Sequence, residues 1–92
     1  MIASMEFHWN AWNIHKCDKH GVRQSEAEYV VRKARRPYPQ RIDDEKTLVW
    51  GQSASGRYLQ VIYLIDQDRT IFVIHAMPLT GKMKRNFRRR QS

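Results

Sequence analysis

The side chains of this sequence that suit chemistry near neutral pH are its histidines, above all His20 and His75. A histidine titrates at about pH 6.5, so it can take up or release a proton at physiological pH. Arg57 and Arg85 add guanidinium groups, which bind phosphoryl oxygens through paired hydrogen bonds. Metal-free RNA cleavage uses residues of these types, because the 2′-hydroxyl loses a proton, the 5′-oxygen gains one and charge on phosphorus is stabilised. We therefore consider His20, Arg57, His75 and Arg85 candidate catalytic residues.

Each candidate also has a simpler structural explanation. His20 could cap the end of a helix, and His75 shares one face of an expected strand with Ile71 and Val73. Tyr63, a further candidate, could belong to the core. For any one residue the structural explanation is favoured, because the convergence of side chains in space is not visible in a sequence.

Metal binding is disfavoured by the spacing of the other candidate ligands. His15, Cys17 and His20 are close in sequence, but on a helix His15 and Cys17 point about 200° apart, so at most Cys17 and His20 share an ion. We expect no metal and no other cofactor, and we expect Cys17 to be a small core residue. The motifs GxxxxGK, GxSxG and HExxH are absent, which excludes phosphate-loop and serine-hydrolase chemistry.

Positive charge is concentrated in two segments of a chain whose formal net charge is +8. Of the 17 lysines and arginines, five lie in residues 32–41 and six in residues 82–90, and neither segment contains an acid. This clustering indicates a polyanionic partner, with nucleic acid ahead of an anionic membrane because no broad apolar helix face accompanies the charge. The alternative is that both segments are solvated surface. The candidate RNA-binding residues are Arg35, Arg36, Lys82, Lys84, Arg88 and Arg89.

Two helices are expected in the first half of the chain, after a short strand at residues 5–9. Asn10 or Asn13 can cap a helix that ends near Gly21. A second helix is predicted because Ser25 and Glu28 have the spacing of a capping box. Its apolar residues recur with helical spacing and end before the Pro37-Tyr38-Pro39 segment; they are Ala27, Val30, Val31 and Ala34.

Beyond Lys46 the apolar period changes to two. Residues 47–52, 57–65 and 70–77 predict three strands, and their short connections predict an antiparallel meander. The middle run is apolar on both faces, so it should be central and at least partly covered on both. A closing helix is expected after Thr80, docked on the sheet through Met83 and Phe87.

Length and composition set the outer limits. Ninety-two residues suffice for a single domain, 1–92, and 41% apolar residues favour folding over disorder. A lone cysteine cannot form an intrachain disulfide, and no apolar run approaches the roughly 20 residues of a membrane span. We expect a cytoplasmic protein with no membrane partner. The oligomeric state is not readable from the sequence.

Four segments together resemble the BrnT family of ribonuclease toxins, which belongs to the RelE-like group. They are KHGV (residues 19–22), SEAEYVV (25–31), GRYLQVIYLI (56–65) and IHAMPLT (74–80), and the likeness extends from Phe7 to Arg90. The resemblance implies an α+β, RelE-like small domain in which an antiparallel β-sheet is packed by helices in the order β-α-α-β-β-β-α.

The resemblance also implies a function. Members of this family are metal-independent ribonucleases of type II toxin-antitoxin systems, and a partner antitoxin, BrnA, binds and neutralises them. The positions that match the family motifs are Lys19, His20, Gly21, Glu26 and Arg57. Where the family commonly has arginine, glutamate and tyrosine, this chain has Met77, Met83 and Phe87.

Three functions are therefore carried forward. The first is metal-independent RNA cleavage by a toxin with a BrnA-like antitoxin. The second is a catalytically weak or inactive toxin-like module that binds RNA or an antitoxin. The third is an interaction protein whose positive charges are incidental.

Overall fold

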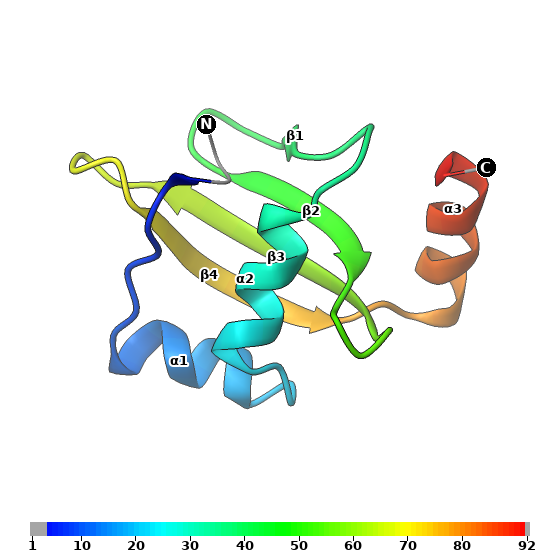
Figure 1. The fold of residues 1–92 in the computed structure, drawn as a ribbon, viewed down its shortest axis with the longest axis horizontal. Coiled ribbons are helices and arrows are strands. Elements are labelled where there is room, and N and C mark those ends of the chain that lie inside the picture. Colours follow the sequence, from blue (N-terminus) through cyan, green and yellow to red (C-terminus); the bar gives the residue numbers. More distant parts are fainter. Residues whose placement is uncertain (1–3, 92) are drawn as a thin grey trace.

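A computed structural model of the chain describes residues 4–91, which form three helices and a four-stranded sheet (Figure 1). Adjacent strands pair antiparallel in the order β1-β2-β3-β4, so neighbours in sequence are neighbours in space. The fold is α+β, as predicted. The elements are α1 (Ala11–Asp18), α2 (Gln24–Arg32), β1 (Gln40–Arg41), β2 (Thr47–Gln52), β3 (Tyr58–Ile65), β4 (Ile71–Pro78) and α3 (Gly81–Gln91).

The expected meander is present as β2, β3 and β4, with β3 between the other two. One face of β3 is buried, because Leu59, Val61 and Tyr63 are at most 2% exposed. Helix α2 lies across this face (Figure 1). It approaches β2 so closely that a Cβ atom added to Gly51 would lie 3.3 Å from a methyl carbon of Val30. Glycine therefore sets the spacing between α2 and the sheet.

The opposite face of β3 is covered only in part. Its residues Tyr58, Ile62 and Leu64 are partly exposed. Helix α3 packs at the Tyr58 end through Phe87, whose ring centroid lies 5.9 Å from that of Tyr58. Phe87 is buried and Met83 packs against the core, as predicted.

The start of α3 also follows the sequence prediction. The Thr80 side-chain oxygen accepts a hydrogen bond from the Met83 backbone N–H at 3.2 Å. Leu79, just before the cap, is buried against the core. This cap satisfies one of the free N–H groups at the helix start.

The predicted first strand at residues 5–9 was wrong in extent. Only Phe7 forms a bridge, a parallel one with Ile71, supported by the His8 N–H donating to the Ile71 carbonyl at 2.9 Å. The His8 carbonyl accepts instead from the Asn13 side chain at 3.0 Å, which takes it out of the ladder. A two-residue strand at residues 40–41 was not predicted, so the described order is α-α-β-β-β-β-α.

The capping box predicted for α2 was also misplaced. The helix begins at Gln24, and the Glu26 carboxylate accepts a hydrogen bond from the Arg23 backbone N–H at 3.1 Å. Glu28 accepts a hydrogen bond from the Trp9 indole N–H at 2.7 Å. Glu28 therefore anchors the N-terminal segment, and Glu26 caps the helix.

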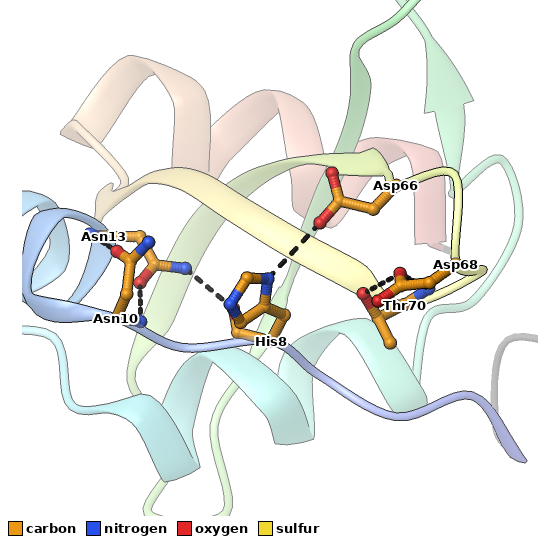
Figure 2. A network of polar contacts seen from close by, with 6 residues as sticks. All are labelled: His8, Asn10, Asn13, Asp66, Asp68 and Thr70. Atoms are coloured by element: carbon orange, nitrogen blue, oxygen red, sulfur yellow. Dashed lines mark hydrogen bonds and ion pairs between the residues drawn. The ribbon is translucent and has the colours of Figure 1, made fainter.

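Helix α1 starts and stops where the sequence predicts. Asn10 and Asn13 exchange hydrogen bonds between side chain and backbone, which caps the helix start (Figure 2). Gly21, with φ of +73°, follows the helix in the left-handed conformation that glycine adopts most easily. Cys17 is buried, as predicted, and burial raises the pKa of its thiol to about 11. No helix within residues 4–91 has the length and apolar character needed to span a membrane.

Asn13 should be the most sensitive polar residue of the core. It is fully buried and bonded to both the Asn10 backbone N–H and the His8 carbonyl (Figure 2). Asn13→Ala leaves both groups without these partners, so we expect the free energy of unfolding to fall by about 2 kcal/mol. Urea denaturation measures this, with the exposed Gln67→Ala as control. Equal stability of the two variants would contradict the assignment.

Candidate functional site

The structure brings His20 and His75 together from distant parts of the sequence. Their ring centroids are 5.4 Å apart, with the rings in an edge-to-face arrangement. His20 follows the end of α1, and His75 lies in β4, against which α1 packs. Both residues were predicted as candidates. Of the four predicted catalytic residues, these two have their rings in contact.

The surroundings of His75 favour its neutral form. Partial burial lowers the pKa of His75 below its ordinary value of 6.5, because water no longer stabilises the imidazolium. The nearby charges of His20, Lys19 and Lys16 lower the pKa further. At neutral pH His75 is therefore an uncharged imidazole that can accept a proton, set among groups that attract phosphate.

Arg57 lies beside the loop that carries His20, but its guanidinium already binds other groups of the protein. Its Nη1 atom donates to the Glu26 carboxylate at 2.9 and 3.0 Å and to the Gly21 carbonyl at 2.9 Å. Gly21 is the neighbour of His20 in sequence, so this guanidinium links the start of β3, the start of α2 and the loop that carries His20. The contacts of Arg57 are those of a residue that holds the site together.

The remaining catalytic candidates lie elsewhere. Arg85 is exposed on α3 and, within residues 4–91, its side chain makes no hydrogen bond or ion pair. Tyr63 is a buried core residue, and desolvation raises the pKa of its hydroxyl. The structural explanation therefore holds for Tyr63.

The two basic segments converge on one pocket. Lys33 and Arg35, which follow α2, and Arg88 of α3 line a cavity of about 250 Å³. The segments are joined directly, because the Gln91 side-chain amide donates to the Arg36 carbonyl at 2.7 Å. Arg90 adds a second link by donating to the Tyr38 hydroxyl at 3.3 Å.

Aromatic rings contact the cations at the place where the two basic segments meet. The ring of Tyr58 has both the Lys84 ammonium and the Arg88 guanidinium at 5.2 Å from its centroid. Arg90 lies 5.9 Å from the ring centroid of Trp50. Such cation-aromatic contacts are typical of surfaces that bind single-stranded nucleic acid.

Three further candidate RNA-binding residues lie around this region. Lys82 is exposed in the first turn of α3, and Arg36 is exposed in the segment after α2. Arg89 donates to the Asn86 side chain at 2.8 Å. The candidates Lys82, Lys84, Arg88 and Arg89 all belong to α3, the helix that docks on the sheet through Phe87.

The partly exposed sheet face connects the pocket to the histidine pair. Trp50, Gln60 and Met77 are opposite one another on β2, β3 and β4, and the Trp50 indole donates to the Gln60 side chain at 2.9 Å. Neighbouring strands are about 4.8 Å apart, so Trp50 and Met77 are separated by about 10 Å across the sheet. His75, two residues before Met77, shares its face. The prediction that His75 shares a face with Ile71 and Val73 was wrong, because a register shift between Val73 and His75 reverses the alternation.

Sequence reasoning missed several pocket residues. Tyr29, Lys33, Trp50 and Tyr58 all line it, but none was named as a candidate. A signal was present for two of them, because a hairpin between residues 52 and 58 places Trp50 and Tyr58 on the same face of paired strands. Tyr29 carried no such signal, since it looked like an ordinary exposed helix residue.

Within the described residues, no group of three or more His, Cys, Asp or Glu side chains is arranged to hold a metal ion. A polar network around His8 lies at the far end of β4 from His75, and there His8 contacts Asp66 at 3.4 Å (Figure 2).

Comparison with protein-family models, curated proteins and solved structures found no significant match. The geometry of the site and the sequence resemblance are therefore what supports a function for this protein.

The lowered pKa of His75 predicts a pH dependence of stability. In the unfolded chain His75 titrates at its ordinary pKa, so below pH 6.5 the unfolded state takes up the proton first. The free energy of unfolding should therefore fall as the pH drops from 6.5 toward the folded-state pKa, and should gain nothing from this group above pH 6.5. His75→Gln should reduce this acid loss, and His15→Gln should retain it. Denaturation from pH 7.5 to 5 measures the effect, and an NMR titration showing the His75 pKa at or above 6.5 would contradict it.

Proposed function

We propose that this protein is a metal-independent ribonuclease in which His20 and His75 transfer the protons. The observation that carries the proposal is the ring contact between these two histidines at 5.4 Å. Two imidazoles are sufficient for the chemistry, because one can act as the base toward the 2′-hydroxyl and the other as the acid toward the leaving 5′-oxygen.

The electrostatics support a division of roles. His75, whose pKa is lowered by burial and by nearby cations, takes the proton of the 2′-hydroxyl as that oxygen attacks phosphorus. His20 in its protonated form gives a proton to the 5′-oxygen as the P–O bond breaks. The products are a 2′,3′-cyclic phosphate and a 5′-hydroxyl, and each step moves one proton. Lys16 and Lys19 supply positive charge near the phosphoryl oxygens.

Arg57 has a positioning role in this proposal. Its bonds to Glu26 and to the Gly21 carbonyl hold the loop of His20 beside the start of β3. Breaking them would let His20 move relative to His75, and small displacements of a catalytic group reduce rates strongly. This role accounts for the ion pair between Glu26 and Arg57 without direct contact of Arg57 to phosphate.

We also propose that the protein is a member of the BrnT family. The sequence resemblance supports a RelE-like fold of the BrnT kind, a cytoplasmic location and a BrnA-like antitoxin as partner. A second function, RNA or antitoxin binding without cleavage, is favoured by one observation: Met77 occupies the face beside His75 where the family commonly has arginine. The third function, an interaction protein with incidental charge, is disfavoured by the convergence of both basic segments on one pocket.

Substitution of the histidines tests the proposal. His20→Gln and His75→Gln should each lower the rate of RNA cleavage by about 10²–10⁴-fold, because each removes one proton-transfer group. His15→Gln, on the exposed side of α1, serves as the matched control and should cleave normally. The assay uses labelled RNA with EDTA present throughout, and detects the cyclic phosphate. Cleavage that requires a divalent ion, or that survives both substitutions, would refute the mechanism.

Met77→Arg provides a test in the opposite direction. An arginine on the same strand face as His75 adds a guanidinium where charge develops on phosphorus, so cleavage should rise by up to about 10²-fold. Met77→Leu keeps the size and removes no charge, so it should cleave like the wild type. If the wild type binds RNA without cutting it and Met77→Arg cuts it, the chain is the catalytically weak module of the second function.

A further inference from the structure

We infer that the pocket between α2, β2 and α3 is a subsite for one unstacked base of single-stranded RNA and its phosphate. This subsite rests on the proposed function in that its ligand is the RNA substrate, but it lies apart from the histidine pair. Its lining combines Tyr29, Trp50 and Tyr58 with Lys33, Arg35 and Arg88.

The charge of the lining selects an anion. Lys33, Arg35 and Arg88 line the pocket, and no acidic side chain does. These cations come from segments far apart in the chain, so their proximity costs repulsion that the fold must offset. A phosphate among them relieves that repulsion, and lysine and arginine are the usual partners of a nucleic-acid backbone.

The aromatic residues select a base as well as a phosphate. Tyr29 is 38% exposed and, within residues 4–91, its side chain makes no hydrogen bond or ring contact. Its ring is therefore free to stack, while Tyr58 is already covered by Lys84 and Arg88. An inorganic phosphate or a phosphorylated peptide would leave the Tyr29 face unused, and stacking on a base uses it.

The size of the pocket limits the ligand. Its volume of about 250 Å³ lies below the range of about 300–1,000 Å³ typical of sites for drug-sized molecules. A volume of this size suits one base rather than several. From this pocket the RNA can reach His75 across the partly exposed sheet face. Trp50 and Met77 are about 10 Å apart on that face.

Binding of an uncleavable oligonucleotide tests the subsite without depending on catalysis. The probe is a fluorescent 2′-O-methyl hexa-adenylate, and a matched abasic hexamer carries the same phosphates without bases. Tyr29→Ala should weaken binding of the hexa-adenylate about tenfold, since one stacked base is lost. Tyr29→Phe should restore it, and neither variant should alter binding of the abasic hexamer.

Charge variants test the phosphate half of the subsite. Arg35→Gln should weaken both oligonucleotides and reduce the slope of log K against log salt by about 0.7, the value for one phosphate contact on a single strand. Arg69→Asn removes the same charge from the turn before β4, at the opposite end of β3, and should change neither affinity nor slope. Thermal denaturation checks that all variants are folded.

The outcomes separate the subsite from the proposed cleavage. If Tyr29→Ala weakens the hexa-adenylate and spares the abasic hexamer, the subsite stands, even if the wild type fails to cut RNA. If Tyr29→Ala has no effect, or weakens both probes equally, the base subsite is overturned, even if the histidine variants abolish cleavage. Arg35→Gln behaving like Arg69→Asn would overturn the phosphate contact.

Discussion

The buried face of β3 is the constraint on which the rest of the structure depends. Burial of Leu59 and of Val61 each stabilises the fold by about 1.5–3 kcal/mol, and Tyr63 is buried beside them, so this face must be covered. Helix α2 covers it and can lie close because Gly51 has no side chain against Val30. Once α2 is placed, the short loop before it holds the end of α1 beside β4. The contact between His20 and His75 is a consequence of this packing.

A second, smaller core brings the positive charges together. The rings of Tyr38 and Tyr58 both lie about 6 Å from that of Phe87, at 6.1 and 5.9 Å between centroids. Burying these rings places the end of α3 next to the segment after α2, although both are strongly basic. The apolar contact thus holds like charges together even at low ionic strength, where their repulsion is least screened. A bound polyanion would reduce this repulsion.

Much of the fold could be predicted from local patterns. The helix caps at Asn10 and Thr80, the β2–β4 meander and the docking of α3 through Met83 and Phe87 all follow from residue type and spacing. The errors arose where a helix side chain took a partner outside its own helix. Asn13 takes the carbonyl of His8, which ends the first strand at one bridge, and Glu28 binds Trp9 instead of capping α2.

For this protein the sequence by itself determined the three helices and the β2–β4 meander, where the positive charge is concentrated and which residues have the chemistry for proton transfer. These properties depend on neighbours within a few positions along the chain. Only the tertiary structure decided that His20 meets His75, that Arg57 is engaged by Glu26 and that Arg35 shares a pocket with Arg88. The physical reason is that those contacts join residues 31 to 55 positions apart, and packing of α1, α2 and α3 on the sheet sets them.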